Sequence, residues 1–190
     1  MSSKFTKSRA NRRVEREGLA LLVADPRFQV ADLPTRRRIL ELLPVHGDWG
    51  VRTFDAIMAP APRPPITSGN VDIYFDELRL VEMKTTLDPI PDASLRGFFF
   101  GATKREYDMA RALGDKYIFA FVVLSDENIY GRPFAVLLTL PEVEERTAKA
   151  RVQYQVNFKS NIALEETDSE QIVVLGNADH LPAPEPNSDV

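Results

Sequence analysis

The spacing of apolar residues predicts two helices near the N-terminus. Residues 7–26 carry an apolar stripe of helical period that should end before Pro26. Residues 33–45 repeat this pattern over a shorter length, with Pro34 suited to the first turn and Pro44 to the end. The chain is therefore expected to begin with helices rather than strands.

A third helix is marked by its capping residues. Thr103 and Glu106 have the spacing of a capping box at the start of residues 102–116, and Gly114 suits the end of that helix. Residues 141–156 begin as a further helix, because a proline in the first turn is compatible with helix formation.

Other segments have the composition of strands. Residues 71–75 (VDIYF) and 78–86 (LRLVEMKTT) are rich in β-branched and aromatic residues, and they are predicted to form a hairpin. Residues 117–125 are almost continuously apolar, as expected of a central strand buried on both faces. Residues 133–140 predict one more strand, whereas residues 51–58 are ambiguous between loop and strand.

This order of elements predicts a mixed α/β domain. The length of 190 residues suits one domain, expected over residues 1–160, with an acidic tail containing several prolines over residues 161–190. No apolar run approaches the roughly 20 residues of a membrane span, and the N-terminus does not have the pattern of a signal peptide. We therefore expect a cytoplasmic protein with no membrane partner.

Charge is unevenly distributed along the chain. Residues 1–40 contain ten Lys or Arg against four Asp or Glu, whereas residues 161–190 contain seven acidic residues and no basic one. A basic N-terminal segment suits the phosphate backbone of DNA, although a solvated helix face explains it equally well. The arginines considered for phosphate contacts are Arg12, Arg13, Arg36 and Arg37.

Candidate chemistry is concentrated in residues 71–86. Glu82 and Lys84 lie on one face of a predicted strand, and a three-residue hairpin turn would put Asp72 opposite Glu82. Two carboxylates this close repel each other unless a cation neutralises them. The chain has no Cys and two His, so carboxylate oxygens are the expected ligands, which favours Mg²⁺, Mn²⁺ or Ca²⁺. Asp55 is an alternative to Asp72, and a two-residue turn would shift the pairing.

Asp72, followed after nine residues by Glu-Met-Lys at 82–84, resembles the PD-(D/E)XK nuclease superfamily. The common core of that superfamily is a helix, a three-stranded meander, a helix and a further strand. Within residues 81–123, the pattern VEMKTT…FFFGATKREYDMARALGDKYIFAFVV is similar to the nuclease-like domain named after the C-terminal part of NO VEIN. The resemblance implies a restriction-endonuclease-like mixed central sheet flanked by helices.

The same resemblance implies a role for each residue of the motif. Asp72 and Glu82 would hold Mg²⁺ or Mn²⁺ with the carbonyl of Met83 as a third ligand, and Lys84 would be the catalytic lysine. The accessory candidates are Glu15, Glu17, Thr85, Thr86 and Glu106. The implied activity is metal-dependent endonucleolytic hydrolysis of DNA, of restriction or phage-defence type, by a homodimer.

Two other interpretations stay open. The domain could be a catalytically inactive module that binds DNA or a protein partner, or the charged hairpin could be an ordinary solvated surface. Phe98, Phe99 and Phe100 could stack on bases, but their composition favours core packing.

Overall fold

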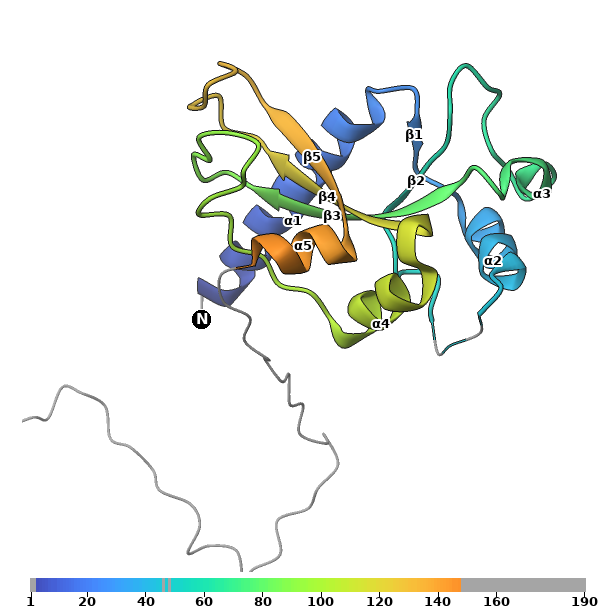
Figure 1. The fold of residues 1–190 in the computed structure, drawn as a ribbon. Coiled ribbons are helices and arrows are strands. Elements are labelled where there is room, and N and C mark those ends of the chain that lie inside the picture. Colours follow the sequence, from blue (N-terminus) through green and yellow to red (C-terminus); the bar gives the residue numbers. More distant parts are fainter. Residues whose placement is uncertain (1–2, 46, 48, 148–190) are drawn as a thin grey trace, which may run out of the picture. The chain divides into compact units, whose positions relative to one another are not determined.

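The computed structural model describes residues 3–45, 47 and 49–147, which belong to the unit Met1–Lys149 (Figure 1). The predicted acidic tail, residues 161–190, lies outside the described residues, and so does the end of the domain expected to reach residue 160. Along the chain the elements are α1 (Ser3–Val23), β1 (Phe28–Gln29), α2 (Leu33–Leu42), β2 (Ala56–Met58), α3 (Val71–Tyr74), β3 (Arg79–Thr86), α4 (Lys104–Leu113), a 3₁₀ turn (Gly114–Lys116), β4 (Tyr117–Val123), β5 (Phe134–Thr139) and α5 (Leu140–Arg146).

The strands of the described chain form a mixed sheet in the order β1-β2-β3-β4-β5. β1, β2 and β3 pair antiparallel as a meander, and β4 pairs antiparallel with β5. β3 and β4 are parallel, and α4 lies in the crossover between them, because two parallel strands cannot be joined by a tight turn. The predicted mixed α/β domain is confirmed.

Most of the predicted helices form where the sequence places them. The side chain of Asp32 accepts a hydrogen bond from the Thr35 amide at 2.9 Å and starts α2. Thr103 and Glu106 form the predicted capping box of α4. In the part of the chain that the structure describes, no helix has both the length and the apolar character needed to cross a bilayer.

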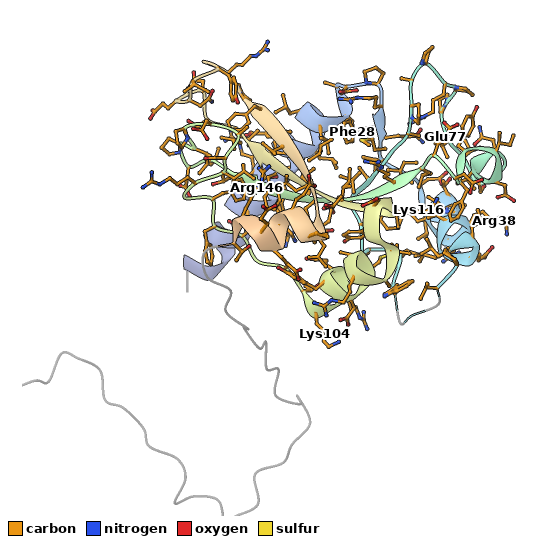
Figure 2. All side chains as sticks on the ribbon, in the orientation of Figure 1. Phe28, Arg38, Glu77, Lys104, Lys116 and Arg146 are labelled. Carbon is orange, nitrogen blue, oxygen red and sulfur yellow. The ribbon has the colours of Figure 1, made fainter. Side chains whose placement is uncertain are left out.

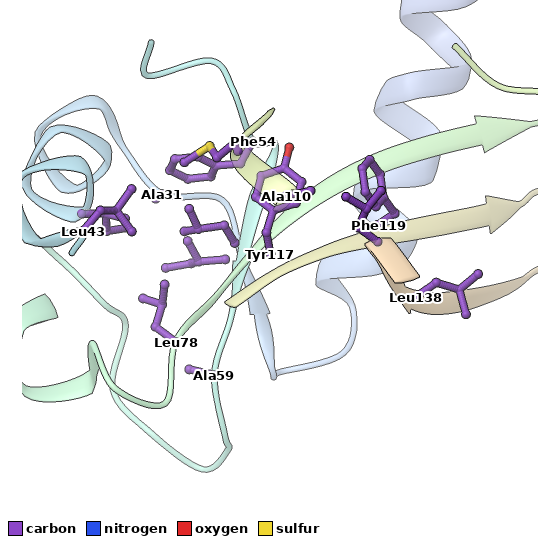
Figure 3. Close-up of a cluster of buried hydrophobic side chains, with 14 of the residues drawn as sticks. Ala31, Leu43, Phe54, Ala59, Leu78, Ala110, Tyr117, Phe119 and Leu138 are labelled. Atoms are coloured by element: carbon purple, nitrogen blue, oxygen red, sulfur yellow. The ribbon is translucent and has the colours of Figure 1, made fainter. Parts of the chain in front are cut away.

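The core lies on both faces of the sheet, as the predicted burial of β4 on its two sides requires. Leu22 of α1 packs with Val81, Met83, Ile118 and other residues on one face. A larger cluster on the opposite face joins β3 and β4 to α2, α4 and α5, with Phe54, Leu78, Tyr117 and Phe119 among its members (Figure 3). The sheet therefore lies between α1 on one side and α4 and α5 on the other (Figure 1).

Close packing holds α1 against the middle of the sheet. Gly18 faces Thr85 of β3, and a Cβ atom at position 18 would lie 2.6 Å from Thr85 Oγ1. A glycine inside a helix weakens it by roughly 1 kcal/mol relative to alanine. Here the missing side chain lets α1 approach β3, the strand that carries Glu82 and Lys84.

The predicted hairpin of residues 71–86 is wrong. Residues Val71–Tyr74 form the short helix α3, and Asp72 on it is exposed and bonded to Arg38 of α2 at 2.6 and 2.9 Å (Figure 2 labels Arg38). The apolar residues that face the core are Val71, Tyr74, Phe75 and Leu78, with Ile73 exposed. This spacing has the period of a helix, which the β-branched and aromatic composition conceals.

Candidate active site

Glu82 and Lys84 lie on the part of β3 that follows Val81 and has no partner in β2. β2 has three residues and pairs only with Arg79–Val81, so the edge of β3 from Glu82 onward is not covered by that strand. Strand alternation places both side chains on the same face as buried Leu80. The sequence prediction that Glu82 and Lys84 share a face is confirmed.

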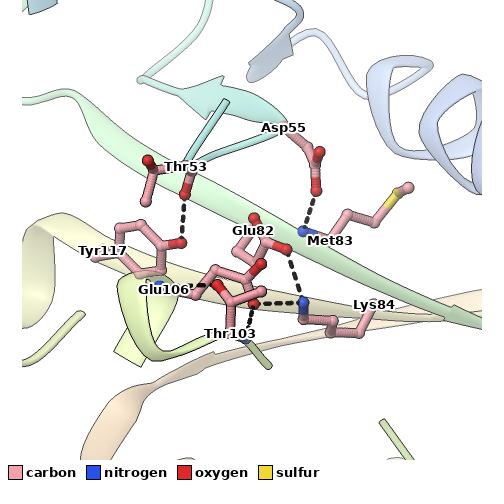
Figure 4. Close-up of polar contacts among 8 residues, drawn as sticks. All are labelled: Thr53, Asp55, Glu82, Met83, Lys84, Thr103, Glu106 and Tyr117. Carbon is pink, nitrogen blue, oxygen red and sulfur yellow. Dashed lines mark hydrogen bonds and ion pairs between the residues drawn. The ribbon is translucent and has the colours of Figure 1, made fainter. Parts of the chain in front are cut away.

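Lys84 is the centre of a buried ionic cluster. Its Nζ donates to Glu82 Oε1 at 2.7 Å and to Glu106 Oε2 at 2.8 Å, and all three side chains are at most 14% exposed (Figure 4). The same Glu106 oxygen accepts the amide of Thr103 at 3.0 Å, which ties the start of α4 to the cluster. Lys84 is therefore held in position by two ion pairs, one to Glu82 of β3 and one to Glu106 of α4.

Asp55, rather than Asp72, faces the edge of β3. Asp55 directly precedes β2, and its Oδ2 accepts the amide of Met83 at 2.9 Å (Figure 4). The N–H and C=O of one strand residue point to the same edge, so the carbonyl of Met83 points to the edge of β3 on which Asp55 lies. The expected pairing of Asp72 with Glu82 is corrected, because Asp72 belongs to α3 and is bonded to Arg38. Asp55, the alternative considered from the sequence, is the aspartate that contacts β3.

The charges in this cluster do not balance. Burial, followed by the charge of Asp55, raises the pKa of Glu82 to about 8. Burial also raises the pKa of Asp55, against the opposing effects of the Met83 amide and Lys84. Burial lowers the pKa of Lys84, but the charge of Glu82 and the hydrogen bonds of both glutamates outweigh it, and the net shift is upward. With all three carboxyl groups ionised, the single ammonium would leave an excess of negative charge, which a bound cation would offset.

The raised pKa of Glu82 predicts an unusual pH dependence of stability. The folded protein retains the Glu82 proton up to about pH 8, whereas an unfolded chain releases it near 4.5. Between these values the folded state binds more protons, so its stability without metal falls as the pH rises. We expect Glu82→Gln to be more stable than the wild type at pH 8, on the order of 3 kcal/mol, and the difference to shrink toward pH 5.

Urea denaturation at pH 5, 6.5 and 8 in EDTA measures this difference. Glu127→Gln is a suitable control, since Glu127 is exposed in the loop after β4. A difference between Glu82→Gln and wild type that does not change over this pH range would show that Glu82 ionises normally.

Several basic side chains of α1 share a cleft with the ionic cluster. The cleft has a volume of about 1130 Å³, and its lining includes Asp55, Glu82, Met83, Lys84 and Glu106 together with Arg12, Arg13, Glu15 and Arg16. Arg12 and Arg13, which the sequence suggested for phosphate contacts, therefore line this cleft, and so does Arg16, which was not predicted. The sequence could have predicted Arg16, because it follows Arg12 by one helical turn and so lies on the same face of the helix.

Two of the predicted arginines are placed differently. The guanidinium of Arg36 donates to four backbone carbonyls, those of Ala31, Val51, Phe54 and Asp55. This corrects the expected phosphate contact, because its donors are already used inside the protein. Arg37 is exposed on α2 and is not part of the cleft lining.

The accessory residues also separate into two groups. Glu15 and Thr85 line the cleft, as does Glu106. Glu17 is bonded to Arg13 at 2.7 Å. The hydroxyl of Thr86 accepts the amide of Asp88 at 3.0 Å, so Thr86 shapes the turn after β3.

A metal ion at this site would have few carboxylate ligands from the protein. Among residues 3–45, 47 and 49–147, no three His, Cys, Asp or Glu side chains are grouped closely enough to hold a metal ion. Asp55 and Glu82 with the Met83 carbonyl still fit a magnesium site, because Mg²⁺ is commonly bound by one or two carboxylates and several waters. No protein-family model, curated protein or solved structure matches the chain.

Proposed function

We propose that the protein is a metal-dependent nuclease that hydrolyses DNA phosphodiester bonds. The observation that carries the proposal is the meeting of Asp55, Glu82 and Lys84 at the open edge of β3, in a cleft that α1 lines with arginines. The order α1, the meander β1 to β3, α4 and β4 supports the resemblance to the PD-(D/E)XK core. Asp55 takes the place first given to Asp72.

Asp55 and Glu82 are the residues that would hold the cation. Burial and the charge of Asp55 raise the pKa of Glu82, and burial raises that of Asp55, so a divalent ion would offset the cost of ionising both carboxylates. When bound, Mg²⁺ or Mn²⁺ supplies the Lewis acidity that activates water and neutralises charge on the phosphate. The Met83 carbonyl would complete the protein ligands on the same edge.

Lys84 would act on the phosphate or on the attacking water. Its ammonium is fixed by Glu82 and Glu106, so it needs no reorganisation when negative charge develops beside it. Glu106 is a positioning residue in this scheme, since it bonds Lys84 and the start of α4 at once.

The arginines of α1 support a nucleic-acid substrate. Arg12, Arg13 and Arg16 are exposed, and they line the same cleft as Lys84. Their positive charge would attract phosphates to the site and would partly offset the repulsion from its carboxylates. A homodimer, in which two sites cut the two strands, stays a prediction.

Calorimetric titration with Mn²⁺ tests the proposal without a choice of substrate. We expect Asp55→Asn and Glu82→Gln each to weaken binding by at least about tenfold. Asp72→Asn is the matched control: Asp72 is exposed, bonded to Arg38 and outside the cleft lining, so Mn²⁺ binding should not change.

A cleavage assay on plasmid and single-stranded DNA with Mg²⁺ or Mn²⁺ completes the test. Metal binding with no cleavage, but with binding of DNA, would favour the inactive DNA-binding module. Equal titrations for all four proteins, repeated with DNA present, would remove the metal site and with it the nuclease.

A further inference from the structure

The three consecutive phenylalanines before α4 do not all pack in the core. The rings of Phe98 and Phe100 meet the edge of Phe121 of β4, with centroid distances of 5.2 and 4.9 Å. Phe99, between them, is 89% exposed. Core packing is confirmed for the two outer residues, and the middle one is an exception.

The exposed ring of Phe99 lies in the cleft of the candidate active site. It lines the cleft that contains Asp55, Glu82 and Lys84, together with the arginines of α1. Exposure of a phenylalanine ring to water is unfavourable, because the ring is one of the largest apolar side chains. The backbone on both sides of Phe99 is anchored because Phe98 and Phe100 pack against the core. The loop would therefore lose little conformational entropy when a ligand stacks on the ring of Phe99.

We propose that Phe99 is a stacking platform for an unpaired base of single-stranded DNA in this cleft. This inference rests on the proposed function and adds its substrate class. Every base offers a flat face to an aromatic side chain once it is unstacked, whereas the bases of a duplex are stacked on each other. Arg12, Arg13 and Arg16 match the charge of the backbone that would carry the base.

Among the residues that the structure describes, the exposed apolar side chains elsewhere do not combine these features. Ile73 on α3 is 78% exposed but is absent from the cleft lining. It therefore provides a matched control, because removing it takes away exposed apolar surface at a distance from the arginines.

Fluorescence anisotropy with a labelled oligodeoxynucleotide, single-stranded or annealed to its complement, tests the inference. All variants carry Glu82→Gln to prevent cleavage. We expect Phe99→Ala to weaken single-strand binding by at least about tenfold, duplex binding to change by less than about threefold, and Ile73→Ala to change neither. Phe99→Trp should retain single-strand binding, and its tryptophan emission should be quenched by the bound strand.

Equal affinities of Phe99→Ala and its parent for the single strand would overturn the stacking role, and so would equal losses on single strand and duplex. Neither result would affect the Mn²⁺ titration, which depends on Asp55 and Glu82. If the Glu82→Gln parent binds neither DNA while the wild-type protein binds Mn²⁺, the nucleic-acid substrate itself is wrong, and the platform is overturned with it.

Discussion

Lys84→Met is expected to reduce DNA cleavage at least about 100-fold while leaving Mn²⁺ binding in place. Losing one preorganised group that stabilises developing charge typically costs a factor of about 10² to 10³. Asp55 and Glu82 remain in Lys84→Met, and removing the ammonium removes a competitor for their charge. The pair of measurements therefore separates the residue that acts on the phosphate from the residues that hold the ion.

Stability provides a second measurement on Lys84→Met. Without the ammonium, Glu82 and Glu106 are left as buried carboxylates, and breaking a buried ion pair typically costs about 3–5 kcal/mol. The loss should be greatest in EDTA at pH 8 and should be partly restored by Mn²⁺. Lys104→Met is the control, since Lys104 is an exposed lysine of α4 bonded to Asp108 (Figure 2). Cleavage by Lys84→Met within about threefold of wild type would exclude the catalytic lysine.

The order of helices and strands could be predicted wherever local chemistry decides it. α2 and α4 begin at residues whose side chains accept backbone amides, Asp32 and Thr103, and such caps can be recognised from sequence. β4 could be predicted because a strand covered on both faces is apolar throughout.

α3 could not be predicted from composition. Residues 71–75 have the β-branched and aromatic residues of a strand, but in the structure Val71, Tyr74 and Phe75 pack against the core at helical spacing. The error carried over to the site, because the choice of Asp72 depended on a hairpin register. Glu82 and Lys84 did not depend on it, since alternation along one strand is local.

The partners of Lys84 and Asp55 could not be predicted either. Glu106 was recognised as a capping residue, but its bond to Lys84 spans 22 positions of the chain and depends on how α4 packs on the sheet. Asp55 meets Met83 only because β2 pairs beside β3 and begins at Ala56, directly after Asp55. Such contacts are set by tertiary packing, for which the sequence offered only the alternative of Asp55.

The segment that carries Asp55 is held by side chains outside the cleft. Arg36 of α2 donates to the carbonyl of Val51 at 3.0 Å, to that of Phe54, and to that of Asp55 at 2.6 Å. The buried hydroxyl of Tyr117 donates to the carbonyl of Thr53 at 2.7 Å (Figure 4). Arg36 also lies over the ring of Phe54, 4.9 Å from its centre.

Arg36→Met should therefore destabilise the protein and displace Asp55. A hydrogen bond from a charged donor contributes about 1.5–3 kcal/mol, and the carbonyls left behind are partly buried, so we expect a loss of about 3 kcal/mol. We also expect at least about tenfold weaker Mn²⁺ binding at a temperature where the variant is folded, although Arg36 contacts no proposed ligand side chain. Urea denaturation and calorimetry measure the two effects.

Arg37→Met is the matched control for this prediction, since Arg37 is the next residue of the same helix and is exposed. It removes the same charge, so a change common to both variants would come from electrostatics at a distance. If Arg36→Met equals Arg37→Met within about 0.5 kcal/mol and binds Mn²⁺ as tightly, the carbonyl bonds do not position Asp55. A loss of metal binding confined to Arg36→Met would show that the position of the aspartate is determined by α2, through the backbone that precedes β2.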